Sequence, residues 1–113
     1  MNNYKYILDK DGNPVICEDV MEWAMCFEKG KRIVQQDYLS KKHLVSTVFL
    51  GLDHNFGVGE PLLYETMVFH NDSGGAATHY ATREEALKGH NKILNDEKQK
   101  LQRKGNKKLS KGE

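Results

Sequence analysis

The sequence predicts an α+β protein: an antiparallel sheet of four to six strands with two helices packed on one face. Two observations lead to this class. Segments with the period or composition of strands come in two groups, and a segment with helical spacing of its apolar residues follows each group. Glycine, asparagine and aspartate separate neighbouring strand segments, as they do in the turns of antiparallel hairpins.

Length and composition indicate one globular domain. The chain has 113 residues, of which 38% are hydrophobic and 29% charged. We expect the domain to span residues 1–97 and residues 98–113 to form a basic tail that is frayed or disordered, because they have few apolar side chains to bury. The tail has a net charge of +6 and the whole chain one of +1, so residues 1–97 have a net charge of −5 and are acidic. This distribution argues against a sequence-specific nucleic-acid binder.

The chain has none of the signals of a membrane or redox protein. No apolar stretch approaches the roughly 20 residues of a membrane helix, and the N-terminal residues lack a leader pattern, so we expect a cytoplasmic protein with no membrane partner. Cys17 and Cys26 form no C-x-x-C pair and are expected to be reduced thiols.

The N-terminal third should contain a hairpin and a helix. Residues 4–8 alternate as a half-buried strand does, the letters DKDGN form a turn, and residues 14–17 return as a short strand. Asp19 can cap a helix that Gly30 ends. Its apolar residues recur at helical spacing and predict a core helix: Val20, Met21, Trp23, Ala24, Met25 and Phe27.

Three strands are expected in the middle of the chain, at residues 31–39, 44–52 and 62–69. Residues 70–80 are rich in Gly, Asn, Asp and Ser and predict a loop, with a short strand at 78–80. Both faces of residues 44–52 are largely apolar, which is typical of a central strand. If the face opposite the helices exposes apolar side chains, a homodimer or higher homo-oligomer is favoured.

The second helix should begin at Thr82, with Glu85 completing a capping box. Its inner face is predicted from apolar spacing: Ala86, Leu87, His90, Ile93, Leu94 and Leu101. His90 lies on this face and is interpreted as a hydrogen-bonded core histidine rather than a ligand.

The segment DHNFGVGEP, residues 53–61, is one candidate site. Asp53 and His54 could serve as base and orienter or as metal ligands, but adjacent residues of an extended chain point in opposite directions. Other histidines lie far away in sequence without ligand spacing, so we predict no metal site. A structural hairpin is favoured, with contact to a ligand or partner by an exposed loop as the alternative.

Arg83 marks a second candidate site, where a glycine-containing loop leads into the second helix. Free N–H groups at a helix N-terminus and an arginine suit a phosphate. Glu84 and Glu85 in the same turn repel an anion, and Thr82 with Glu85 would occupy some of the donors. An ordinary capped helix is therefore the favoured interpretation. Elsewhere we find no catalytic set and expect no cofactor.

Three motifs together cover most of the chain from Cys17 to Leu94: CEDVMEWAMCFE, VSTVFLGLDHNFGVGEPLLYETMVF and YATREEALKGHNKIL. In this order they resemble a widespread family of small proteins encoded by tailed bacteriophages and prophages. Members usually have no assigned function, so the resemblance implies an origin and transfers no catalytic residue. The basic segment after Leu94 lies outside the resemblance.

We therefore expect a phage accessory binding protein of the host bacterial cytoplasm, not an enzyme. As an anti-defence factor it would sequester a nucleotide-derived immune signal or block a host defence protein. The candidate contacts to a nucleotide-like ligand are His54, Phe56, His79 and Arg83. The alternatives are a small metal-assisted hydrolase that uses Asp53 and His54, and a structural or regulatory phage protein.

Overall fold

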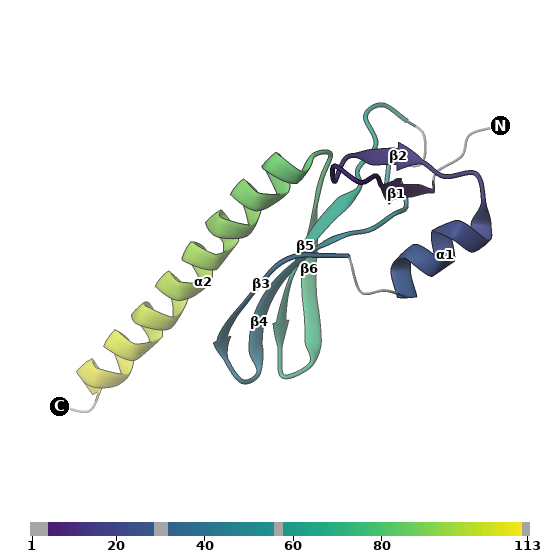
Figure 1. The fold of residues 1–113 in the computed structure, drawn as a ribbon. Helices are drawn as coiled ribbons and strands as arrows, with labels where there is room; N and C mark the ends of the chain where they lie inside the picture. Colours follow the sequence, from purple (N-terminus) through teal and green to yellow (C-terminus); the bar gives the residue numbers. More distant parts are fainter. Residues whose placement is uncertain (1–4, 29–31, 56–57, 112–113) are drawn as a thin grey trace.

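The computed structural model describes residues 5–28, 32–55 and 58–111, and the side chains of residues 5–26, 32–55 and 58–104. It confirms the α+β class, with a four-stranded antiparallel sheet, a two-stranded hairpin and two helices (Figure 1). The strands of the larger sheet are adjacent in chain order: β3 (Ile33–Ser40), β4 (His43–Phe49), β5 (Tyr64–His70) and β6 (Ser73–Tyr80).

The central strands are β4 and β5, as their composition predicts. They pair antiparallel from His43 opposite His70 to Phe49 opposite Tyr64. β4 is buried along most of its length because β3 and β5 flank it and helix α2 (Arg83–Lys111) covers one face. Residues 50–63 connect the two strands and form a loop longer than a tight turn.

The β6 strand is longer than the sequence predicts. Residues 73–80 form a strand of eight residues, whereas a loop with a short strand at 78–80 was expected. The reason is the two-residue turn at Asn71 and Asp72, whose φ angles of 50° and 69° both lie in the left-handed region. Such a turn matches the twist of paired strands, so pairing with β5 resumes at once. Gly74 then lies beneath Met67, whose Cε would be 2.7 Å from an added Cβ.

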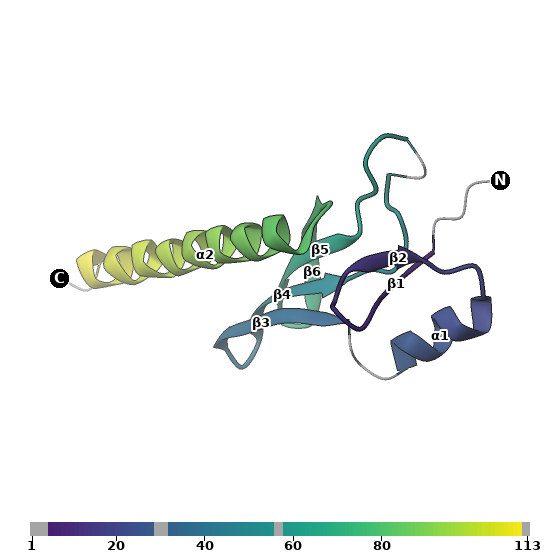
Figure 2. The ribbon, with the colours of Figure 1, turned by 45° about the horizontal axis from the view of Figure 1, so that its top comes forward.

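Helix α2 (Arg83–Lys111) packs across all four strands of the sheet. Thr82 caps it as expected, since its Oγ1 accepts a hydrogen bond from the Glu85 amide at 3.1 Å. The predicted inner face is confirmed at three buried positions, Ala86, His90 and Leu94. The C-terminal part of α2 extends beyond the sheet in both views (Figures 1 and 2). The frayed or disordered state expected of residues 98–113 stays a prediction.

The N-terminal segment forms a hairpin of β1 (Tyr6–Leu8) and β2 (Pro14–Ile16), followed by α1 (Val20–Glu28). The Asp19 carboxylate caps α1 by accepting the amides of Met21 and Glu22 at 2.9 and 3.2 Å. The helix contacts β1, and the indole of Trp23 donates a hydrogen bond to the Gly51 carbonyl at 2.9 Å.

The prediction that α1 is a core helix is wrong for much of its apolar stripe. Val20, Met21 and Met25 are 55%, 69% and 53% exposed. Helical spacing shows which residues share a face, but not how much of that face a neighbouring element covers. The main core lies instead between the first turns of α2, the hairpin and the adjoining ends of the strands. It consists of Phe49, Leu63, Tyr64 and Ala86, with Tyr6, Leu8, Val34 and Tyr80 packed around them.

Candidate functional site

A row of hydrogen-bonded polar side chains lies between α2 and the sheet. His90 on α2 is fully buried, and its two ring nitrogens contact Asp37 Oδ2 and Thr47 Oγ1, each at 2.7 Å. The Thr47 hydroxyl contacts that of Thr66 at 2.5 Å. The interpretation of His90 as a hydrogen-bonded core histidine is confirmed. An Asp, a His and a hydroxyl are aligned, but both threonine hydroxyls are buried and paired with each other, so we interpret the row as structural.

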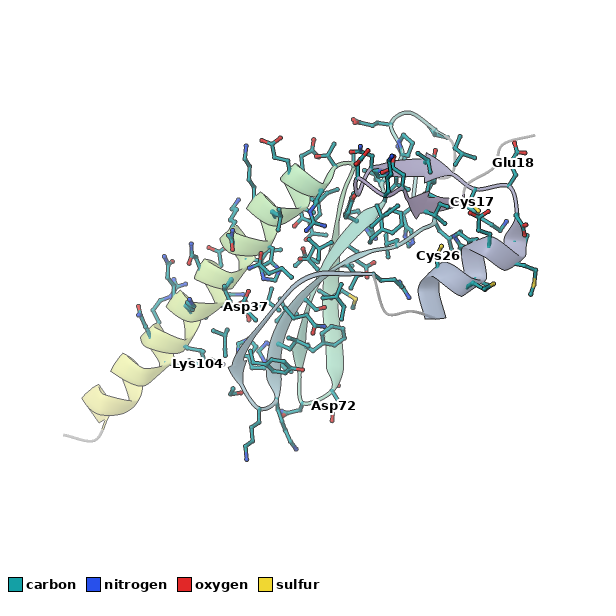
Figure 3. The ribbon with its side chains drawn as sticks, viewed as in Figure 1. Cys17, Glu18, Cys26, Asp37, Asp72 and Lys104 are labelled. Atoms are coloured by element: carbon teal, nitrogen blue, oxygen red, sulfur yellow. The ribbon has the colours of Figure 1, made fainter. Side chains whose placement is uncertain are left out.

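Asp37 in this row is partly open to solvent, with 38% of its side chain exposed. Figure 3 labels it on the sheet beside α2. Hydrogen bonds from Gln35 and from His90 hold the pKa of Asp37 below its usual value of 3.8 and outweigh the effect of burial. The carboxylate therefore remains ionised at neutral pH and joins β3 to α2.

The structure brings together His54 and His79, two of the residues predicted to contact a ligand. Their rings stack with centroids 4.8 Å apart, and His79 Nε2 is 2.9 Å from Glu65 Oε2. Glu65 and His79 are cross-strand partners on β5 and β6. The neighbouring pair Tyr64 and Tyr80 packs in the core beneath α2. Because strand side chains alternate, Glu65 and His79 lie on the sheet face opposite α2, and His54 stacks on His79 there.

Asp53 has a structural role in the loop between β4 and β5. Its buried carboxylate accepts hydrogen bonds from the amides of Asn55 and Leu62 at 2.7 and 3.0 Å. Both hydrogen bonds tie the carboxylate to the backbone of its own loop. This geometry favours the predicted structural hairpin over a base and its orienter. Phe56, another predicted contact, lies outside the described residues.

Arg83 lies apart from the two histidines, at the first residue of α2. It lines a surface hollow of about 740 Å³ between the helix and the β1–β2 turn, together with Lys10, Asp11 and Glu84. Tyr64 also borders the hollow, and its buried hydroxyl has no hydrogen-bond partner among the described residues. Burial raises the pKa of Tyr64, and the charge of Arg83 acts in the opposite direction.

A further cluster was missed at the sequence level. His43, His70 and Glu97 come from β4, β5 and α2, and their ligand atoms all lie within 4.8 Å of one another. One signal could have placed the two histidines together. Aligning the runs 44–49 and 64–69 in opposite directions puts residue 43 opposite residue 70. The approach of Glu97 depends on how α2 crosses the sheet.

No family model matches the chain, and the comparisons with curated proteins and with solved structures found no match. In the part of the chain that the structure describes, no helix combines the length and apolar character needed to cross a membrane.

Proposed function

We propose that this chain is a non-catalytic binding protein, which takes a phosphate-bearing, nucleotide-like ligand in the hollow around Arg83. The observation that carries the proposal is the Tyr64 hydroxyl, which is buried at the edge of this hollow without a partner among the described residues. A buried polar group without a partner costs free energy, and a ligand oxygen that accepts its hydrogen bond removes that cost.

The charges around the hollow support a nucleotide better than a free phosphate. Lys10 and Arg83 can neutralise a phosphate, and the first-turn amides of α2 add donors. Asp11 and Glu84 would repel a second anionic group, but their carboxylates can accept hydrogen bonds from ribose hydroxyls. The balance of two cations and two anions thus favours a ligand with both a phosphate and a sugar.

A panel of cyclic nucleotides and ADP-ribose derivatives tests this proposal by thermal shift. A ligand at 100 times its dissociation constant should add about 2.7 kcal/mol to the free energy of unfolding. Arg83→Ala should abolish the shift, whereas Arg103→Ala, on the same helix away from the hollow, should retain it. Tyr64→Phe should weaken binding while stabilising the free protein by about 1 kcal/mol, because it removes an unpaired buried hydroxyl.

An absence of any shift would contradict nucleotide binding. The blocking of a host defence protein would then be the remaining form of the proposal, and a pull-down from host extract that returns one protein would support it. The alternative hydrolase, with Asp53 and His54 as its catalytic pair, has less support because the Asp53 carboxylate is used by backbone amides of its own loop.

The proposed biological setting follows from the resemblance to phage proteins. A small phage protein with no catalytic set fits an accessory factor that acts in the host cytoplasm against bacterial defence, by sequestering a nucleotide-derived immune signal.

We also propose that the protein forms a homodimer through the sheet face opposite α2. Ile33 and Tyr38 on β3 are 53% and 65% exposed, and Leu44 and Phe69 lie beside Tyr38 on this face. A second copy would cover these apolar side chains.

A further inference from the structure

We propose that His43, His70 and Glu97 form a binding site for a divalent first-row transition metal ion, with Zn²⁺ as the probe. The site lies on the α2 side of the sheet, at the end where the β3–β4 and β5–β6 turns lie. It is separate from the hollow around Arg83 and does not depend on the proposed nucleotide binding.

The distances suit a metal without rearrangement of the backbone. His43 Nε2 and His70 Nε2 lie 2.9 and 3.4 Å from the same oxygen, Glu97 Oε1. With metal–ligand bonds of roughly 2.0–2.1 Å and a tetrahedral angle, neighbouring ligand atoms are about 3.3 Å apart. Two imidazole nitrogens therefore lie near this spacing from one carboxylate oxygen, and all three ligand atoms are within 4.8 Å of one another.

The fold holds the ligands from three directions. His43 and His70 are cross-strand partners on β4 and β5, and their rings lie with centroids 4.1 Å apart. Glu97 reaches them from α2, with only 8% of its side chain exposed. A buried hydrogen bond between His43 and Glu97 would need only one histidine. A metal site also accounts for the second histidine, because His70 Nε2 lies near the same carboxylate oxygen.

A second side chain orients the Glu97 carboxylate toward the two histidines. Lys100 contacts Oε2 at 2.9 Å, which leaves Oε1 directed at the two histidines. The carboxylate is thus oriented by a neighbouring residue, as metal ligands commonly are.

The site is accessible and has room for a fourth ligand. The side chain of His70 is 59% exposed, and the cluster borders a hollow of about 410 Å³ that Asp96 and Lys104 also line. Figure 3 shows Lys104 on α2 and Asp72 at the end of the β5–β6 hairpin. Two histidines and one glutamate leave a coordination position for water or an anion, and nitrogen with oxygen ligands suits zinc, nickel or copper better than calcium.

The full chain, stripped with a chelator, tests the proposal by titration with Zn²⁺ in a calorimeter and by the visible spectrum with Co²⁺. We expect one equivalent of zinc to bind and tetrahedral cobalt bands to appear. Zinc at 100 times its dissociation constant should raise Tm by about 10 °C. His70→Ala should weaken zinc binding by more than the roughly tenfold loss typical of an outer-shell partner. Because His70 is exposed, this variant should fold normally.

His79→Ala is the matched control, since His79 belongs to the other group of two histidines and a glutamate, His54, Glu65 and His79. It should bind zinc as the unmodified chain does. Glu97→Gln keeps the shape of the side chain and should lose both zinc binding and the cobalt bands, with folding checked by circular dichroism. Absence of zinc binding by the unmodified chain, or loss in His79→Ala with retention in His70→Ala, would overturn the proposal.

Discussion

His90 shows how one side chain can specify the position of a helix. Its ring is fully buried and contacts Asp37 on β3 and Thr47 on β4, while Thr47 contacts Thr66 on β5. Hydrogen bonds of this kind require one register between α2 and three strands, whereas apolar packing tolerates small shifts. The buried hydroxyls cost little because each has a partner.

The Asp37 contact predicts a pH-dependent contribution to stability. The folded pKa lies below the usual 3.8, so the ionised form stabilises the fold above that pH, and the contribution is lost as pH falls through the folded pKa. Asp37→Asn should lower the free energy of unfolding by about 1–2 kcal/mol at pH 7, a figure reduced for the partial exposure of the carboxylate. Urea unfolding at pH 7, 5 and 3 measures the difference, which should shrink toward pH 3. A constant difference would contradict the assignment.

At the scale of elements, the loop between β4 and β5 differs from the end of α2 in how firmly it is held to the rest of the fold. The loop is anchored by a buried carboxylate, which accepts two backbone amides through Asp53 Oδ1. Beyond Glu97, α2 has little to hold it to the sheet, since Leu101 is already 44% exposed and residues 102–108 are polar or glycine. A helix without packing contacts is marginal in water.

Hydrogen exchange should therefore divide α2 into two parts. Amides of residues 87–97 should be protected to near the global stability, because their side chains pack on the sheet. Amides of residues 102–111 should exchange at close to the unprotected rate, and removing residues 105–113 should change the free energy of unfolding by less than about 0.5 kcal/mol. Exchange measured by mass spectrometry on peptides from both parts provides the test. Protection that extends to residue 108 would indicate a contact for the tail.

At the scale of the whole molecule, the two faces of the four-stranded sheet differ. α2 covers one face, and the other exposes apolar residues of β3. The molecule measures 64 × 29 × 24 Å because α2 extends past the sheet (Figure 2). An elongated protein with one open sheet face can bury that face by pairing with a second copy.

We predict a homodimer that depends on this open face. Sedimentation equilibrium at tens of micromolar should give twice the chain mass of 12.9 kDa. Tyr38→Lys should produce a monomer, since it places a charge among the apolar residues of the face. Met21→Lys is the control, because Met21 is 69% exposed on α1, away from this sheet. A monomeric unmodified chain would contradict the prediction, as would equal effects of both substitutions.

Much of the secondary structure follows from local rules in the sequence. Asp19 and Thr82 cap their helices as predicted because a cap depends only on residues within one turn. The strands β3, β4 and β5 follow from β-branched and aromatic composition. Composition underestimates the length of β6, because Gly, Asn, Asp and Ser favour loops. Pairing with β5 across a two-residue turn extends the strand.

The sequence by itself determined the α+β class, the helix caps, the central strands and the burial of His90, because these depend on periodicity and near neighbours. Only the tertiary structure decided which distant groups come together: His54 with His79, His43 with His70 and Glu97, and Arg83 and Tyr64 at one hollow. Strand register and the crossing of α2 bring these groups together. Neither leaves a spacing pattern in the chain, since each depends on contacts between residues far apart in sequence.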